Sequence, residues 1–538
     1  MSALTSEFAA SVNRRRSIAL AIAGSAFLGA LYIFAHDQQA IGTINGWWED
    51  ELYSLWASEP AQHFADALSQ RILPDSNPPL YYAVLYWMRH LIADERSATT
   101  FINLGALTVA VLSVLYISKK SDTLPLGLFG CATFLLSGPV LRYSAEGRSY
   151  LCAIALTFVA SWLCASALLV PRRPPAWSGF ALLGALSAMI HVYSALMCCC
   201  LAAGLFVAAW FWRRSDLWIP SLALGIPAGA LTFAWLAYAH ATGSVENLAW
   251  IQFSPAKVII AAGEVMLLAF PVGVDIAALD FALHTAGAPL PDVILAAFPG
   301  ILAFGLIVLI LCYGLSSKRL GAASAAFGVC FLLFFALPVA ASFKQPIIIG
   351  RYWMIGTPGA IVVLLFLIRE WIDDISERGK GWPFSLCAAA AAAAVVGMTT
   401  FNGFAAARAF IIAKPIWSGA AVVARLGENC PLPSVRILIH SPPFLDAAKY
   451  FYTTVSKMPE GAFIPIFLGG GNSDRHSSHH PSCPILGWAE HVIPDVVHVD
   501  VQKATDQELL SLLKIDIASG EAQILRHKKG YVVLRRTP

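Results

Sequence analysis

The sequence has 538 residues, of which 58% are hydrophobic and only 13% are Asp, Glu, Lys or Arg, and its mean hydropathy is +0.66. A typical soluble domain carries about 25% charged residues, so this composition excludes a soluble enzyme, a secreted toxin and a disordered scaffold. The formal net charge of +3 does not indicate nucleic-acid binding, because Lys and Arg come in short clusters between apolar runs. The chain is predicted to be a polytopic membrane protein.

About eleven apolar segments approach the roughly 20 residues that a helix needs to cross a bilayer. The first follows Arg14, Arg15 and Arg16, and its apolar run is too long for an ordinary signal-peptide core, so we expect an uncleaved anchor. The predicted spans are residues 17–36, 98–117, 124–141, 149–170, 177–193, 194–212, 217–240, 293–314, 322–342, 352–369 and 383–404.

The connections between these spans predict the orientation of the chain. With a cytoplasmic amino terminus, every cytoplasmic connection carries a basic pair, as the positive-inside rule requires. These basic residues are Lys119, Lys120, Arg172, Arg173, Arg213, Arg214, Lys318, Arg319, Arg369, Arg378 and Lys380. An odd number of spans then places the carboxyl-terminal residues on the outer side.

Two further apolar pieces are predicted to lie at the outer interface. Counting residues 79–88 as a span would invert every later loop, and the piece is too short to cross a bilayer. Its Tyr and Trp content is typical of an interfacial helix. Residues 258–270 contain Glu264 and are expected to form a second interfacial or re-entrant helix. The largest extracytoplasmic loops are therefore residues 37–97 and 241–292.

Residues 406–538 hold 25 of the 69 charged residues and are predicted to form a small extracytoplasmic α/β domain after the membrane domain, residues 1–405. Strands are expected at 435–440 and 531–534, and helices at 444–452 and 506–513. Nine of the 11 cysteines lie in apolar runs, whereas Cys430 and Cys483 lie in this tail and are predicted to form a disulfide in an oxidising compartment. The alternative is two reduced, buried thiols.

The tail also contains a histidine cluster, His476, His479 and His480. Such a cluster can bind a metal. No acidic or cysteine partner follows at a fixed spacing, so a solvated loop is the preferred interpretation.

Three consecutive carboxylates, Glu49, Asp50 and Glu51, follow the first span among tryptophans and Tyr53. Neighbouring carboxylates at an interface repel one another and hold protons more readily, which suits one of them to act as a general base. The alternative is a solvated acidic turn anchored by a tryptophan belt. The same cluster offers oxygen ligands for Mg²⁺ or Ca²⁺.

Other polar groups recur at the predicted outer ends of spans. Arginine is a natural phosphate ligand because its planar fork binds bidentately and stays charged, although a single basic residue there more often anchors a helix by snorkelling. Carboxylates and guanidinium groups at one face suit a reaction that deprotonates a hydroxyl and holds an anionic leaving group. These stretches are residues 75–82, 142–150, 191–193, Lys344 and 350–352.

Five motifs in order over residues 10–405 resemble those of the GT-C membrane glycosyltransferases. The nearest branch is the bacterial relatives of protein O-mannosyltransferases and lipid A aminoarabinose transferases. The motifs are Asp50-Glu51 with Tyr53, the start of the 77–82 segment, residues 143–150, residues 191–193 and Arg351-Tyr352.

The resemblance implies a GT-C-like polytopic α-helical fold with about 11 transmembrane helices in the bacterial inner membrane, an amino terminus in the cytoplasm and a periplasmic carboxyl-terminal domain. It implies transfer of a sugar from a polyprenyl-phosphate donor to a glycolipid, polysaccharide or protein at the outer face, with inversion. No cofactor is required, although a divalent cation can be accommodated. The partners are donor, acceptor and bilayer, with no nucleic acid.

The resemblance also implies residue roles. Asp50 matches the general base, Glu51 the adjacent acid, and Glu146 with Arg148 the groups near the sugar and its phosphate. Arg351, helped by Lys344, matches the basic residue that holds the carrier phosphate. Asn77 stands where many relatives have His or Lys, so it departs from the pattern. The other expected substrate-binding residues are Tyr53, Asn77, Tyr82, Tyr150, His191, Tyr193 and Tyr352.

Two other functions fit the composition. A transporter or flippase of a lipid-linked saccharide is expected to show ionisable groups near the midplane, but the central parts of the predicted spans contain no Asp, Glu, Lys or Arg. A membrane scaffold whose tail binds cell-wall components leaves the carboxylate cluster and the ordered motifs without a role.

Overall fold

The computed structural model describes residues 17–36, 38, 49–169, 176–243, 258, 315, 321–348 and 350–377, together with five short strands between residues 435 and 536. The chain divides into two compact units. One comprises Met1–Ile44 and Leu68–Ala413, and the other comprises Asn45–Ala67 and Lys414–Pro538. The segment Asn45–Ala67, which includes the predicted carboxylate cluster, therefore groups with the carboxyl-terminal unit.

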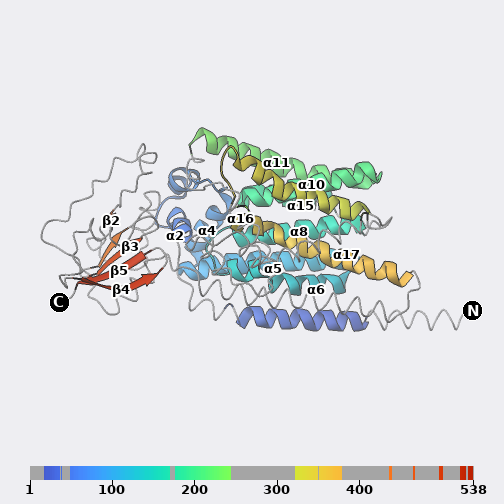
Figure 1. Ribbon diagram of the computed structural model, residues 1–538, viewed down its shortest axis with the longest axis horizontal. Helices are drawn as coiled ribbons and strands as arrows, with labels where there is room; N and C mark the ends of the chain where they lie inside the picture. Colours follow the sequence, from blue (N-terminus) through green and yellow to red (C-terminus); the bar gives the residue numbers. More distant parts are fainter. Residues whose placement is uncertain are drawn as a thin grey trace, which may run out of the picture. The chain divides into compact units, whose positions relative to one another are not determined.

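The first unit is helical throughout its described part (Figure 1). Short irregular helices join some of its elements: the π-helix Leu68–Ile72 and the 3₁₀-helices Ser215–Leu217 and Met354–Gly356. After the helix Ser17–His36, the α-helices are α4 (Leu80–Leu91), α5 (Glu95–Lys120), α6 (Leu124–Leu135), α7 (Gly138–Tyr143), α8 (Tyr150–Leu169), α9 (Trp177–Ile190), α10 (Val192–Phe211), α11 (Trp218–Ala241), α15 (Gly321–Ser342), α16 (Gly350–Trp353) and α17 (Thr357–Glu377).

Among the described residues, six helices are long and apolar enough to cross a membrane, so the chain is a multi-pass membrane protein. Three of the predicted spans correspond to shorter apolar helices, Leu124–Leu135, Trp177–Ile190 and Gly350–Phe366. The predicted spans 293–314 and 383–404 lie outside the described residues. The six longer helices are Ser17–His36, Glu95–Lys120, Tyr150–Leu169, Val192–Phe211, Ser215–Ala241 and Gly321–Ser342.

The prediction of one continuous span at 124–141 is wrong. The helix stops at Leu135, and α7 begins after Ser137, whose extended backbone (φ −71°, ψ 145°) separates the two. Pro139 in the first turn of α7 has no N–H to donate to a continuing helix. The break leaves α7 as a short helix that leads into the predicted site loop.

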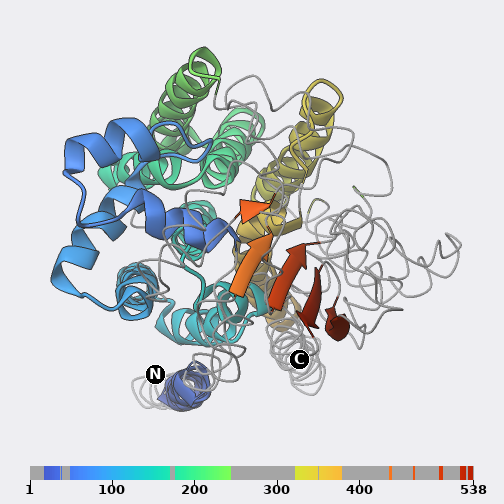
Figure 2. The same cartoon turned by 90° about the vertical axis from the view of Figure 1, so that its left-hand side faces the viewer.

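Helix α8 lies at the centre of the bundle, and 94% of its most apolar stretch is buried inside the protein. It packs against α5, α9, α10 and α17, and α10 in turn packs against α11 and α15. Figure 2 looks along these helices and shows them side by side. Close contact between α10 and α15 depends on Gly204, where an added Cβ would lie 2.2 Å from the Ala326 carbonyl oxygen.

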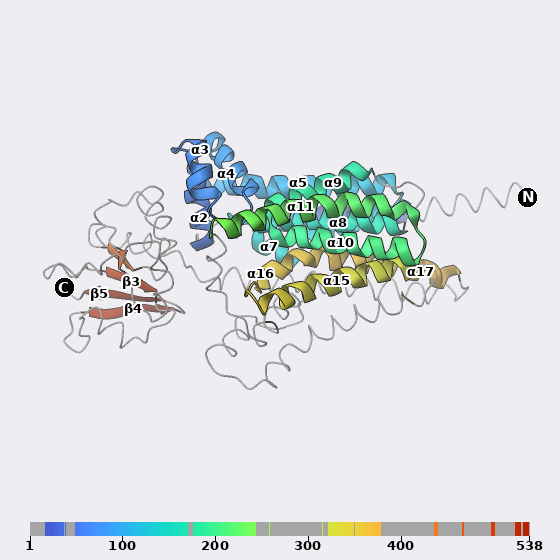
Figure 3. The ribbon, with the colours of Figure 1, turned by 90° about the horizontal axis from the view of Figure 1, so that it is seen from above.

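The helix ends sort into two groups at opposite ends of the bundle. At one end, Arg214 donates to the carbonyls of Ala167 and Leu168 at the end of α8. Lys119 and Lys120 end α5, whose first turns contact the loop that leads into α8. At the other end lie α4, α7 and α16 (Figure 3). The basic pairs predicted to be cytoplasmic, as far as they are described, therefore lie at the end away from the motifs that resemble a transferase site.

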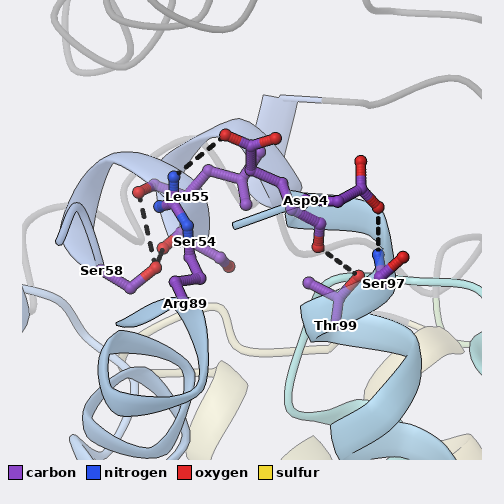
Figure 4. Close-up of polar contacts among 8 residues, drawn as sticks. Ser54, Leu55, Ser58, Arg89, Asp94, Ser97 and Thr99 are labelled. Carbon is purple, nitrogen blue, oxygen red and sulfur yellow. Dashed lines mark hydrogen bonds and ion pairs between the residues drawn. The ribbon is translucent and has the colours of Figure 1, made fainter. Parts of the chain in front are cut away.

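The turn between α4 and α5 is fixed by polar contacts at both helix ends (Figure 4). Asp94 caps α5 by accepting from the Ser97 amide at 2.7 Å, and hydrogen bonding to the Ser97 side chain and then to its amide lowers the pKa of the Asp94 carboxyl. Arg89, near the end of α4, pairs with Glu95 at 3.3 Å. The turn between α4 and α5 is thus held at both helix ends.

In the second unit, the described helices are α2 (Glu49–Ala57) and α3 (Phe64–Ala67). Just after the end of α2, the Ser58 hydroxyl donates to the Ser54 carbonyl at 2.6 Å (Figure 4). The five strands form one mixed sheet in the order β2-β1-β3-β5-β4. β1 is parallel to β2 and β3, whereas β3, β5 and β4 pair antiparallel. The strands are β1 (Val435–Leu438), β2 (Pro465–Ile466), β3 (Val496–Asp500), β4 (Ala522–Lys528) and β5 (Tyr531–Arg536).

Strands occur at the two positions where the sequence predicts them, β1 and β5. The expected helices 444–452 and 506–513, the disulfide Cys430–Cys483 and the histidine cluster lie outside the described residues. Of the cysteines in apolar runs, seven are described, and all seven are free thiols.

Candidate functional site

Arg148, in the loop between α7 and α8, is joined to the start of α4 through a phenol. Its Nη1 donates to the Tyr82 hydroxyl at 2.7 Å, and that hydroxyl donates to a carboxylate oxygen of Asp75. The same Asp75 oxygen accepts from the Asn77 amide at 3.2 Å. Both Arg148 and Tyr82 are buried. A buried guanidinium and a carboxylate are therefore linked through one hydroxyl.

His191 separates α9 from α10 and caps α10. Its extended backbone (φ −161°, ψ 135°) ends α9, and its Nδ1 accepts from the Tyr193 amide at 3.1 Å. A neutral ring that accepts at Nδ1 carries its proton on Nε2. His191 is 2% exposed, and its Nε2 has no hydrogen-bond partner among the described residues. The protein thus buries an N–H donor that is available to an acceptor.

The charge environment keeps this ring neutral. Burial lowers the pKa of His191 well below its usual value, and the positive charges of Arg148 and Arg351 lower it further. Both guanidinium groups therefore lie within electrostatic reach of the same imidazole. The three side chains define one cationic site with a neutral donor, which we call the arginine–histidine site.

Aromatic rings surround His191. The centroid of its ring is 5.5 Å from that of Tyr150 and 5.3 Å from that of Tyr352, and Tyr352 lies 5.0 Å from Tyr193. The Arg351 guanidinium lies over the rings of Tyr150 and Tyr352, at 5.8 and 5.6 Å. Aromatic faces attract a cation and restrict its motion, so the cluster positions Arg351.

The segment that carries Arg351 is held by hydrogen bonds from other helices. The Tyr193 hydroxyl donates to the Ile347 carbonyl at 2.7 Å, and the Ile347 amide donates to the Ser342 hydroxyl at 3.1 Å. Beyond α16, the 3₁₀ turn Met354–Gly356 breaks the helix, and Thr157 on α8 donates to the Ile355 carbonyl at 2.7 Å. These bonds satisfy backbone groups that a continuous helix would pair internally.

The structure brings most of the predicted residues of the first unit together. Tyr82, Asn77 and Arg148 meet through Asp75, and a second group meets around His191: Tyr150, Tyr193, Arg351 and Tyr352. Arg148 belongs to both groups through its effect on His191. Glu146 is buried two residues before Arg148.

Other predicted residues lie elsewhere. Lys344 is exposed just past the end of α15. Asp50, Glu51 and Tyr53 lie on α2, in the second unit, where Glu51 is buried and the Tyr53 ring lies 5.5 Å from that of Trp56. Their participation in the arginine–histidine site stays a prediction.

Sequence reasoning missed three contributors to the site. Asp75 stands inside a motif stretch, but nothing local marks it as the partner of Tyr82. Trp235, near the end of α11, donates its Nε1–H to the Ser76 carbonyl at 3.2 Å. The Met354 sulfur accepts hydrogen bonds from Arg142 Nη1 at 3.8 Å and from the Tyr143 hydroxyl at 3.5 Å. These pairs are more than 150 residues apart in sequence, so no local pattern could reveal them.

The arrangement suits an anion with several oxygen acceptors. Two guanidinium groups supply charge and N–H donors, and the His191 Nε2–H supplies a neutral donor. Among the described residues, no group of three or more His, Cys, Asp or Glu side chains is placed to hold a metal ion.

No protein-family model matches this sequence, and no curated protein sequence matches it. Among solved structures, ArnT from Cupriavidus metallidurans, bound to undecaprenyl phosphate, is similar over 94% of this chain and 97% of its own, with 10% identity and a TM-score of 0.49.

The Archaeoglobus fulgidus oligosaccharyltransferase in its apo form is similar over 88% of this chain and 70% of its own, with 12% identity and a TM-score of 0.43. Its complex with Zn and sulfate is similar over 92% and 69%, with 12% identity and a TM-score of 0.42.

Proposed function

We propose that this chain is a membrane glycosyltransferase that takes a sugar from a polyprenyl-phosphate carrier and places it on a hydroxyl of a glycolipid, polysaccharide or protein at the outer face. One observation carries the proposal: the buried His191 keeps an Nε2–H with no partner among the described residues, and it packs against the same two rings, Tyr150 and Tyr352, that hold Arg351. Burial and the charges of Arg148 and Arg351 lower its pKa. A phosphate group can accept a hydrogen bond from that donor, and its negative charge is attracted by both guanidinium groups.

The position of the site supports a lipid-linked donor. Its residues come from the ends and connections of apolar helices: the start of α8, the junction of α9 with α10, and α16. A phosphate bound at this level lets a long isoprenoid chain stay in the bilayer. The sugar on the other side of the phosphate then extends towards water.

The chemistry is a single displacement. The acceptor oxygen forms a bond to the anomeric carbon, and the bond from that carbon to the phosphate oxygen breaks with inversion. The proton of the acceptor passes to Asp50, and the polyprenyl phosphate leaves with the bonding electron pair. Arg148 and Arg351 stabilise the charge that develops on the leaving group, while Glu51 serves as the acid adjacent to Asp50 and Glu146 acts near the sugar and its phosphate.

Paired variants of His191 test the phosphate site. His191→Asn keeps an oxygen that can cap α10 but removes the distal N–H, whereas His191→Gln keeps a distal amide donor but loses the cap geometry. A hydrogen bond to a charged group contributes about 1.5–3 kcal/mol. We therefore expect His191→Asn to weaken binding of polyprenyl phosphate at least tenfold while the thermal unfolding midpoint stays near that of the wild type.

His191→Gln should show the opposite pattern, with a lower unfolding midpoint and smaller loss of affinity. Binding is measured in detergent micelles with a polyprenyl phosphate and, for comparison, with a polyprenol of the same length. Equal affinity of wild type and His191→Asn for the phosphate, in a folded protein, contradicts the proposed site.

The role of Asp50 is tested separately. General base catalysis contributes about 10²–10⁴ in rate, so Asp50→Asn should lower the transfer rate at least about 100-fold with little change in polyprenyl-phosphate affinity. Glu49→Gln is the matched control, since it removes a neighbouring carboxylate that has no assigned role. Full activity of Asp50→Asn removes Asp50 from the mechanism.

A further inference from the structure

Asn103 is a buried polar residue in an apolar helix. It lies on α5, two turns from the amino end, and is 0% exposed. Its Nδ2 approaches three carbonyl oxygens of one distant loop: Glu146 at 2.8 Å, Ser144 at 3.0 Å and Tyr143 at 3.5 Å. The amide therefore contacts the loop that carries Glu146 and leads to Arg148, some 40 residues away in sequence.

A second residue of α5 completes the contact. Arg96, two turns before Asn103, donates its Nη1 to the Ala145 carbonyl at 3.0 Å. Together the two side chains bind four successive carbonyls, those of residues 143–146. Carbonyls in a loop between membrane helices need donors, because an unpaired buried carbonyl is costly.

We propose that Asn103, assisted by Arg96, is a positioning residue for the arginine–histidine site. By turning the carbonyls of residues 143–146 towards α5, it fixes the course of the backbone from which Glu146 and Arg148 project. Arg148 then reaches Tyr82 on the neighbouring helix α4. Phosphate affinity consequently depends on a residue that does not contact the phosphate. This last consequence rests on the proposed function, whereas the clamp on the loop does not.

The chemistry of the site requires a donor at position 103. Three carbonyl oxygens surround Nδ2, so an acceptor there would be repelled. The Asn103 oxygen, which is buried, has no hydrogen-bond partner among the described residues. The side chain therefore acts through its N–H groups, although its oxygen has no hydrogen-bond partner among the described residues. Apolar replacements of similar size would avoid that cost but would take this donor away from the carbonyls of Ser144 and Glu146.

Asn103→Asp, measured at about pH 9 so that the buried carboxyl is ionised, is the sharpest test because it keeps the shape and removes the donors. Hydrogen exchange measured by mass spectrometry should show the amides of residues 143–149 exchanging at least about tenfold faster than in the wild type, with α8 and α10 unchanged. Polyprenyl-phosphate affinity should fall about tenfold. Both effects should diminish at lower pH, since a protonated carboxyl can donate to a carbonyl, and the wild type should lack this pH dependence.

Thr99→Val is the matched control. Thr99 is equally buried on α5, but among the described residues its hydroxyl donates to carbonyls of its own helix, those of Glu95 and Arg96, at 3.1 and 2.9 Å. This variant should leave loop exchange and phosphate affinity within about twofold of the wild type. Loop exchange in Asn103→Asp that matches Thr99→Val overturns the clamp.

A double-mutant comparison separates the clamp from the proposed function. If Asn103 acts through Arg148, Asn103→Ala should weaken polyprenyl-phosphate binding about tenfold alone but less than about threefold in an Arg148→Ala background. Fully additive losses contradict the positioning role. If Arg148→Ala leaves binding unchanged, the proposed function fails, and the hydrogen-exchange result still decides whether Asn103 holds the loop.

Discussion

The Arg148 guanidinium donates to the Tyr82 hydroxyl at 2.7 Å, which joins residues 66 positions apart in sequence. The same hydroxyl donates to Asp75, so Tyr82 stands between a cation and an anion. The phenol therefore sets the direction of Arg148 and partly balances its charge. The orientation of Arg148 depends on α4 as much as on its own loop.

Tyr82→Phe removes this link while keeping the buried ring. Arg148 then loses one of its hydrogen bonds. We therefore expect polyprenyl-phosphate affinity to fall and the transfer rate to fall about tenfold. The cost in stability should be about 1 kcal/mol, the net contribution of one hydrogen bond. Initial rates and thermal unfolding measure the two effects.

The matched control is Tyr116→Phe. Tyr116 is 64% exposed and lies near the end of α5, away from the arginine–histidine site. Its transfer rate and unfolding midpoint should equal those of the wild type. A Tyr82→Phe enzyme with wild-type kinetics refutes the idea that the phenol orients Arg148.

The buried His191 makes stability depend on pH. Its pKa is lowered in the folded protein, so the unfolded chain, whose histidines titrate near pH 6.5, binds more protons below that pH. The stabilising effect of a neutral His191 is therefore fully present above about pH 6.5 and is lost as the pH falls. If the ring stays neutral at pH 5, the loss there is about 2 kcal/mol.

His191→Asn cannot titrate, so its unfolding midpoint should fall less than that of the wild type between pH 7.5 and pH 5. Other histidines contribute equally to both proteins and cancel in the comparison. The slopes are compared, because the substitution also changes absolute stability. Identical slopes indicate that His191 is not buried as a neutral ring.

Much of the bundle follows from hydrophobicity alone, because a membrane helix must be apolar over most of its length. The ends of α5, α8 and α10 fall within a few residues of their predicted positions. Internal breaks were harder to place. The 3₁₀ turn Met354–Gly356 lies inside an apolar run. The carbonyl of Ile355 in this turn accepts a hydrogen bond from Thr157 on α8. Such breaks depend on donors from distant helices.

The candidate site shows the same division. His191 and the two arginines stand in short motifs that the sequence displays, so the sequence could name them as candidates. Asn103 gave one signal that sequence reasoning did not use, an amide within a predicted span. Its partners, the carbonyls of the loop before α8, are backbone groups. Backbone partners leave no side-chain pattern in the sequence, so only the structure reveals them.

Arg214 is expected to stabilise the protein without affecting catalysis. It donates to the carbonyls of Ala167 and Leu168 at 3.0 and 3.1 Å and pairs with Asp216 through two nitrogens, at 2.7 and 2.8 Å. Arg214→Gln should lower the free energy of unfolding by about 1–2 kcal/mol, because unpaired carbonyls at a helix end are costly. Its transfer rate should match the wild type.

Asp216→Asn isolates the ion pair from the helix cap. The Asp216 side chain is 41% exposed, and exposed ion pairs contribute about 0–1 kcal/mol. This variant should therefore lose less stability than Arg214→Gln. If Asp216→Asn loses as much stability as Arg214→Gln, the ion pair accounts for the effect and the contacts to the α8 carbonyls do not.

The packing of α10 against α15 is expected to depend on Gly204. A Cβ there would lie 2.2 Å from the carbonyl oxygen and 2.8 Å from the carbonyl carbon of Ala326, both backbone atoms that cannot rotate away. Gly204→Ala must push the two helices apart, and overpacking of this kind costs about 1–3 kcal/mol.

Gly328→Ala on α15 is the control, because nothing lies within 4 Å of its added Cβ. The control should unfold at the wild-type midpoint or slightly above it, since alanine favours a helix by up to about 1 kcal/mol over glycine. Thermal unfolding in one detergent compares the three proteins, and equal midpoints for both variants show that α10 and α15 do not approach this closely.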